Sequence, residues 1–270
     1  MATRLKPYDF LMAVRALPKK MARSLPKSES SKTLVESAAN KRGLSKMLDG
    51  TLREGAHDMR VFGLGFLRSV ATKDDYVHFT TGMYHYYGAM EERFGKSDRS
   101  SLAGKVWQQF PELPRQDKIQ HDLKIVGAWK EGLAMSAATE NYVNSIHTAA
   151  DEEGGARLLG HLYVRYFADL FGGRALGAPT RLALKLPETP HFYVWDASVE
   201  ANRREYIERL YVELNVAGEG MEDAAQRERV VDEARLAFAH NASVYVEQPG
   251  LNMGAAKGAL NIAVGAISRR

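Results

Sequence analysis

The stretch YVRYFADLFGG, residues 163–173, decides how this chain folds, because it joins a helical pattern to features that weaken a helix. Its aromatic residues recur at the spacing of a buried helix, but Asp169 lies in the middle and Gly172 and Gly173 follow directly. A glycine inside a helix costs on the order of 1 kcal/mol relative to alanine. Either the pair ends the helix or permits a tight helix crossing, or it forms a kink where the backbone lies against a flat ligand.

Helical spacing recurs on both sides of this stretch. The longest apolar and aromatic stripe consists of Tyr76, Phe79, Met83, Tyr87, Met90 and Phe94. These residues are three or four positions apart, which predicts one buried helix face. Strand signals are scarce, and only ETPHFYVWD (188–196) favours an extended segment. The sequence therefore predicts an all-α single domain of roughly seven to nine helices.

Composition excludes several classes of protein. The 270 residues are 45% hydrophobic and 26% charged, which is typical of a globular chain. The sequence has no run of eighteen apolar residues, so it predicts no membrane span. There is no cysteine, so disulfides, thiolate metal sites and a cysteine nucleophile are excluded. Residues 1–32 hold eight Lys and Arg against Asp9 and Glu29, a net charge of +6, so the remainder carries −2. We therefore expect no nucleic-acid partner.

The two ends differ in composition from the middle. Residues 1–32 are basic and poor in acids, which indicates either the remnant of an organellar transit segment or a flexible arm. We expect an organellar location, a plastid ahead of a mitochondrion, with the cytoplasm as the alternative. Residues 33–247 are predicted to form the domain. Residues 248–270 are mildly apolar, and we interpret them as a tail rather than a docking helix.

Five blocks of the sequence resemble, in order, the motifs of the heme oxygenase family. MYHYYGAMEERF (83–94) resembles L-Y-x-x-Y-x-A-M-E-E-E, and FPELPRQDKIQHDL (110–123) is similar to F-P-E-L-x-R-x-x-x-L-x-x-D-L. YVRYFADLFGG (163–173) resembles the distal-helix signature Y-T-R-Y-L-G-D-L-S-G-G. HFYVWD (191–196) and VVDEARLAFAHNASVY (230–245) resemble F-Y-x-W-D and I-V-D-E-A-x-x-A-F-x-x-N-x-x-x-F. Their order makes the resemblance specific.

The resemblance implies a fold and an activity. The fold would be an all-α, multi-helix domain that holds heme between a proximal helix and a kinked distal helix, with Gly172 and Gly173 at the kink. The activity would be the oxidative cleavage of heme to biliverdin, carbon monoxide and ferrous iron, with heme as both substrate and cofactor. An electron donor such as ferredoxin or a reductase is implied, because the chain has no flavin or nicotinamide motif.

The resemblance also assigns site residues. Asp169 matches the aspartate that organises a distal water network and supplies protons, and Arg165 and Tyr87 match residues of the same polar network. Residues that wall the pocket or fix the last helix over it are matched by Phe238, Asn241 and Tyr245. Ordinary packing is the alternative interpretation for each of them.

The proximal iron ligand is where the pattern departs from the family. Ungapped counting from Phe62 places Glu54 at the ligand position, and the nearest histidine is His57. A deletion of three residues before this histidine, relative to the family, would rotate the helix by about 300°. His57 would still face the iron if the helix shifted along its axis to compensate. We predict that His57 is the ligand. The alternative is that His57 is a surface histidine, or one whose hydrogen bonds are satisfied within the protein. His85 and His161 are the alternative ligands, and a di-iron reading of Glu54 and His57 lacks a second Glu-x-x-His pair.

Four further positions bear on activity. Ala168 replaces the glycine before the aspartate, and Phe171 replaces a small serine, so added bulk there would displace distal water. Tyr211 aligns with a family arginine that binds the heme propionates, and Arg209 is the predicted substitute. Arg53 and Arg204 are further candidates for this clamp.

Two functions remain open. The first is an active heme oxygenase, supported by the aspartate, the arginine and the glycine pair. The second is a catalytically inactive homologue that does not ligate heme and acts as a scaffold or partner-binding protein in an organelle. The displaced histidine, the two bulkier residues and the thin propionate clamp support the second.

Overall fold

The computed structural model describes residues 42–53 and 59–268. The predicted ligand His57, Glu54 and the basic segment 1–32 lie outside these residues, as does the side chain of Arg53. All elements in the described part are helices, which confirms the all-α prediction.

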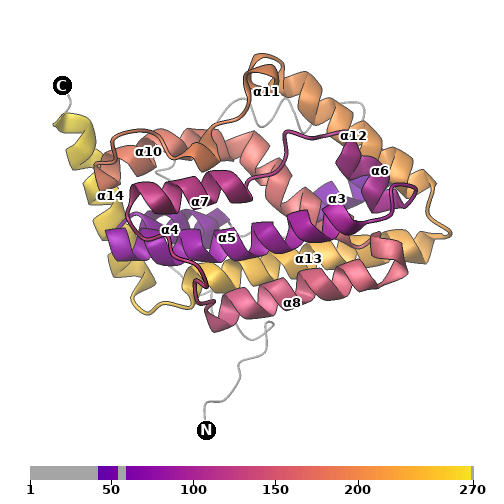
Figure 1. The fold of residues 1–270 in the computed structure, drawn as a ribbon, viewed down its shortest axis with the longest axis horizontal. Coiled ribbons are helices and arrows are strands. Elements are labelled where there is room, and N and C mark those ends of the chain that lie inside the picture. Colours follow the sequence, from indigo (N-terminus) through magenta and orange to yellow (C-terminus); the bar gives the residue numbers. More distant parts are fainter. Residues whose placement is uncertain (1–41, 54–58, 269–270) are drawn as a thin grey trace, which may run out of the picture.

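The long helices form one bundle (Figure 1). The distal segment is the part of the chain that contains residues 163–173. Before it come α3 (Gly43–Arg53), α4 (Met59–Ser69), α5 (Lys73–Lys96), α6 (Leu102–Gln108), α7 (Gln116–Ile125) and α8 (Ala137–Asp151). After it come α11 (Ala197–Ala201), α12 (Arg203–Glu219), α13 (Ala224–Val246) and α14 (Leu251–Ile267). Helices α5, α8 and α13 lie side by side along the long axis, and α14 stands across one end.

Helix α5 supplies the centre of the core. Thr72 caps it by accepting a hydrogen bond from the backbone N–H of Asp75 at 3.0 Å, which satisfies a donor at the helix start. All six residues of the predicted stripe are buried, from Tyr76 to Phe94. The prediction that these residues share a buried face is therefore confirmed.

The segment 188–196 forms no strand, contrary to expectation. A short 3₁₀ turn, η6, spans His191–Tyr193 instead. The carboxylate of Asp122 on α7 accepts hydrogen bonds from the backbone N–H groups of His191 at 2.6 Å and Phe192 at 2.9 Å. These amides are paired with a side chain, so no neighbouring strand is needed to satisfy them.

The C-terminal segment is a helix rather than the expected tail. Helix α14 packs against α4 and against α10 (Arg174–Leu184). Close approach is permitted by two glycines: a Cβ at Gly254 would lie 2.0 Å from Arg68, and one at Gly258 would lie 1.8 Å from the carbonyl oxygen of Leu67. Among the described residues, no helix is both long and apolar enough to cross a membrane.

Candidate active site

The distal segment departs from regular α-helical geometry over ten of its residues. It runs from α9 (Leu158–Leu162) through two π-helical turns, Tyr163–Phe167 and Asp169–Gly173, into α10. Such wide turns are rare and concentrate at functional sites. Arg165 and Asp169 lie one in each turn, so the predicted polar residues occupy the irregular part of the helix.

The two glycines are not required by backbone conformation. Gly173 has φ −54° and ψ −44°, and neither glycine has a positive φ. A Cβ added at Gly172 would meet no heavy atom within 4 Å, and one at Gly173 would make ordinary contact with Asp169 at 3.5 Å. Packing within the described protein therefore gives no reason for Gly172, and the tight-crossing interpretation does not apply to it.

Tyr87, Arg165 and Asp169 form one buried cluster. The hydroxyl of Tyr87 donates a hydrogen bond to Asp169 Oδ2. Arg165 donates to the same hydroxyl from Nε at 3.2 Å and from Nη2 at 3.0 Å, and Nη2 lies 3.9 Å from Asp169 Oδ1. Arg165 is 5% exposed and Asp169 6%, so water screens these charges little.

The electrostatics suit a proton-transfer role for Asp169. Burial raises the pKa of this carboxyl, although the Arg165 guanidinium and the Tyr87 hydrogen bond both act to lower it. Burial also raises the pKa of Tyr87 well above its usual range, so that its hydroxyl stays protonated and donates. A carboxyl with a raised pKa can exchange a proton closer to neutral pH than an ordinary aspartate can.

Two buried hydroxyls beside this cluster, and one buried oxygen on α13, have no hydrogen-bond partner within the described part of the chain. They are the hydroxyls of Tyr86 and Tyr142 and Oδ1 of Asn241. The Tyr86 and Tyr142 rings are 4.9 Å apart, and the Arg165 guanidinium lies 5.1 Å from the Tyr86 ring. Buried polar groups without partners are rare and commonly mark ordered water or a ligand.

Sequence reasoning missed two of these residues. Tyr86 immediately precedes Tyr87 in a pair of adjacent tyrosines, and that pair was the available signal. Tyr142 lies on α8, outside every block that carried the resemblance, so nothing in the sequence marked it. Asn241 on α13 was predicted and is buried beside the same segment.

Ala168 and Phe171 lie on different sides of the distal segment. Ala168 is exposed, as is Gly172 one turn later, so these two residues form a small open face. Phe171 is turned instead towards α12, with its ring centroid 6.3 Å from that of Tyr211 and 6.0 Å from that of Phe167. The expected obstruction by Phe171 therefore does not arise in this arrangement.

The predicted aromatic wall is present as a connected group. Phe238 on α13 meets Phe62 on α4 edge to face, with centroids 6.3 Å apart. Tyr245 contacts Phe62 at 5.7 Å and stacks on Phe79 at 4.6 Å. These contacts tie α4 and α5 to α13.

The structure does not bring Arg209 into the cluster. Arg209 is exposed, with its guanidinium 5.4 Å from the Phe110 ring centroid. Tyr211 is buried and packs on Phe167 with ring centroids 4.6 Å apart. Arg209 and Tyr211 lie on different sides of α12, because residues two apart on a helix point about 200° away from each other. Arg204 is exposed near the start of α12.

Tyr211 takes part in a second buried polar contact. The hydroxyl of Tyr163 donates to Asp49 Oδ1 at 2.6 Å, and the hydroxyl of Tyr211 lies 3.5 Å from the same oxygen. Asp49 is on α3, so this carboxylate links α3 to the distal segment and to α12.

The two alternative histidine ligands lie in different surroundings. His161 is fully buried and its Nε2 lies 2.9 Å from Glu233 Oε1 on α13. His85 is partly buried, meets the Tyr84 ring edge to face at 5.4 Å, and has its pKa lowered by burial. Neither belongs to the cluster around Asp169.

Comparisons with known proteins agree with this geometry. The family model for heme oxygenase matches residues 54–247. The chain is 30% identical over 217 residues to heme oxygenase 1 of Synechocystis sp., covering 77% of this chain and 87% of that protein. It is 31% identical over 222 residues to heme oxygenase 1 of Nostoc sp., covering 77% and 88%.

A solved structure gives the same result for the fold. The crystal structure of heme oxygenase-1 from Synechocystis in complex with heme superimposes with a TM-score of 0.64 at 28% identity, covering 82% of this chain and 96% of that one. The fold and the buried cluster thus define an all-α protein of the heme oxygenase type. The chain belongs to the heme oxygenase family.

Proposed function

We propose that this protein is a heme oxygenase, which cleaves heme to biliverdin, carbon monoxide and ferrous iron with dioxygen and electrons from an external donor. The observation that carries the proposal is the placement of the Tyr87, Arg165 and Asp169 cluster. It is buried in the irregular part of the distal segment, directly next to the open face formed by Ala168 and Gly172. The same cluster would serve no evident purpose in a purely structural bundle.

Heme fits the residues present on two counts. A flat ring can approach the backbone only where side chains are small, and an added Cβ at Gly172 would point into free space. The unpartnered oxygens of Tyr86, Tyr142 and Asn241 offer sites for water beside the reacting centre. Heme, when bound, supplies the iron that activates dioxygen and the ring that is oxidised.

The chain's own residues would hold and move protons. Asp169, with its raised pKa, would exchange a proton with a water molecule bound beside its buried carboxyl. Tyr87 fixes the orientation of that carboxyl by donating to Oδ2. Arg165 carries a permanent positive charge and fixes the Tyr87 hydroxyl through two donors, so the carboxyl is held in one position.

The remaining assignments complete the proposal. His57 is proposed as the residue that would hold the heme iron, since Nε2 of His161 is paired with Glu233. A ferredoxin or a reductase is proposed as the electron donor. The basic segment 1–32 supports a location in an organelle, with a plastid as the first choice.

A second candidate function is favoured by one observation. Tyr211, at the position expected to hold a propionate-binding arginine, is buried against Phe167, and Arg209 lies over Phe110. A family member without this clamp would bind heme weakly and could act as a partner-binding homologue that performs no chemistry.

A hemin titration distinguishes the two functions. We expect a saturable Soret band on adding hemin to the purified protein, followed by decay to a biliverdin spectrum when ferredoxin, its reductase and NADPH are added in air. His57→Ala should abolish the imidazole-ligated spectrum, and His85→Ala should leave it unchanged. No saturable Soret band would overturn the proposal, and a stable band without biliverdin would favour the inactive homologue.

A further inference from the structure

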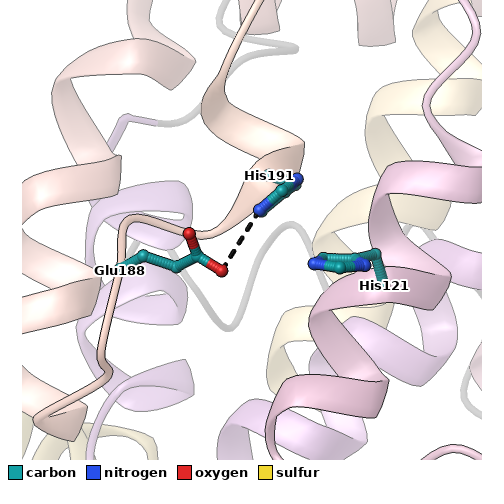
Figure 2. Close-up of side chains that lie close together, drawn as sticks. All are labelled: His121, Glu188 and His191. Carbon is teal, nitrogen blue, oxygen red and sulfur yellow. Dashed lines mark ion pairs between the residues drawn. The ribbon is translucent and has the colours of Figure 1, made fainter.

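We propose that His121, Glu188 and His191 form a surface binding site for a divalent metal ion of the zinc class. His121 lies on α7, Glu188 lies on the connection between α10 and η6, and His191 is the first residue of η6. Figure 2 shows the three side chains converging from two sides of a gap between these segments. They are the one such group of potential metal ligands found in residues 42–53 and 59–268.

The distances approach those of a metal site. The ligand atoms of all three residues lie within 4.8 Å of one another. Glu188 Oε1 is 3.3 Å from His191 Nε2, and the two histidine rings have centroids 4.1 Å apart. Two ligands bound to one zinc ion at about 2.0 Å with tetrahedral angles are about 3.3 Å apart. The Glu188 and His191 pair already has this separation.

The remaining adjustment falls on side chains that are free to move. His121 and Glu188 are exposed, and His191 is partly exposed, so a rotation of the His121 ring closes the gap without disturbing the core. By contrast, the backbone beneath them is held firmly. The carboxylate of Asp122 accepts hydrogen bonds from the N–H groups of His191 and Phe192, which fixes the turn beside His121. Pro190, directly before His191, has a fixed φ angle and limits backbone rotation there.

The donor set selects the class of metal. Two imidazoles and one carboxylate are ligands that zinc and its neighbours accept, whereas calcium and magnesium prefer oxygen donors alone. Three protein ligands leave a fourth position for water, and the exposure of the group allows water to reach it.

The position of the site gives a bound metal a structural consequence. Phe192, next to His191, packs edge to face on Tyr87 with centroids 5.6 Å apart. Tyr193 lies 3.0 Å from the position of an added Cβ at Gly177 on α10. A metal ion would therefore join α7 to the turn that supports Tyr87, while lying outside the cluster of Tyr87, Arg165 and Asp169.

Zinc titration of the full-length protein, without an affinity tag, tests the proposal. Calorimetry with ZnCl₂ should show one site per chain, and Co²⁺ should give the visible absorption of a four-coordinate ion. His121→Asn with His191→Asn should abolish both signals, and Glu188→Gln should weaken Zn²⁺ binding on the order of tenfold or more. His147→Asn, a histidine on α8 outside the group, is the matched control and should change neither.

The outcomes separate cleanly. One Zn²⁺ site that is lost in the double variant and kept in His147→Asn supports the proposal. Saturable binding that survives in the double variant would place the metal elsewhere and overturn it. An absence of binding to the unaltered protein would reduce the group to the ion pair between Glu188 and His191. Circular dichroism of each variant shows that the loss is not one of folding, since all three residues lie at the surface.

Discussion

At the scale of single residues, folding and chemistry make separate demands on the distal segment. Arg165, Asp169 and Tyr87 are buried and bonded to one another, whereas Ala168 and Gly172 face outward from the same helix. The buried side carries the groups proposed to handle protons, and the open side is free of the packing constraints that normally fix residue size. Substitutions on the two sides should therefore have different effects.

Removing the carboxyl of Asp169 should uncouple oxygen use from bilin formation. In Asp169→Ala the proton donor is lost while the fold remains, so biliverdin formation should fall on the order of 10²-fold while reductant and oxygen are still consumed. Oxygen-electrode traces and bilin absorbance, recorded together, measure the ratio. The exposed Asp98→Ala is the control. An undiminished biliverdin yield would remove Asp169 from the mechanism.

A large side chain at Gly172 should block heme without harming the fold. In the protein alone a Cβ at this position meets nothing within 4 Å, so Gly172→Leu should leave the melting temperature unchanged or higher. Hemin affinity, measured from the Soret titration, should fall more than tenfold. Gly95→Leu is the matched control, because Gly95 is also helical and an added Cβ there also meets nothing. Equal hemin affinity in the two variants would move heme away from this face.

At the scale of helices, a partly buried glutamate connects three elements. Glu91 on α5 accepts backbone hydrogen bonds from Arg115 at 2.6 Å and Gln116 at 3.1 Å, where α7 begins, and the hydroxyl of Tyr166 lies 3.3 Å from Oε1. Burial raises the pKa of Glu91 to about 7 despite these hydrogen bonds, which act to lower it. The distal segment and α7 are thus both attached to α5 through one titratable group.

Stability should consequently fall as Glu91 loses its proton. The folded protein keeps this proton up to about pH 7, whereas the unfolded chain releases it near pH 4.5, so the free energy of unfolding decreases as the pH rises between these values. The change amounts to about 3 kcal/mol. Glu91→Gln keeps a carbonyl acceptor and should abolish the decrease.

Urea unfolding at about pH 5 and about pH 8 measures this effect. From about pH 5 to about pH 8, the free energy of unfolding of the unaltered protein should fall by about 3 kcal/mol more than that of Glu91→Gln. Glu92→Gln is the control, because Glu92 is exposed and its pKa is lowered through hydrogen bonding to Lys96. Identical pH dependence with and without Glu91 would show that its carboxyl stays ionised in the folded state.

Much of the helical arrangement was predictable, because helical periodicity is a local signal. Spacing predicted the stripe from Tyr76 to Phe94, whereas only the resemblance implied that Tyr87, Arg165 and Asp169 belong to one polar network. The turn at His191–Tyr193 did not, because the side chain of Asp122, about 70 residues earlier, satisfies its amides. The propionate-binding role of Arg209 stays a prediction, and its exposed position on α12 is compatible with a charged residue at the surface.

At the scale of the whole molecule, α14 lies beyond the region that the heme oxygenase model matches, residues 54–247. It nevertheless packs on α4 and on α10, the continuation of the distal segment. The chain therefore uses its last helix to join two elements that lie more than 100 residues apart in the sequence. This helix was interpreted as a tail because the length and the charges of the segment were taken to fit a tail better than a docking helix.

A side chain at Gly258 should loosen this junction. A Cβ there would lie 1.8 Å from the backbone oxygen of Leu67, so Gly258→Val forces α14 away from α4 and should cost about 1–3 kcal/mol. Chemical denaturation measures the loss. Ala256→Val, at an exposed position of the same helix, controls for the helix propensity of valine. Equal stability of the two variants would mean that α14 adds little to the domain.

The open glycine at position 172 also bears on the history of this chain. No contact in the described protein requires it, and alanine at a helical position is favoured over glycine by about 1 kcal/mol. A chain released from selection for ligand binding would gain stability from that single substitution, and random change would readily supply it. Retention of the less stable residue is what continued selection for an occupied face would produce.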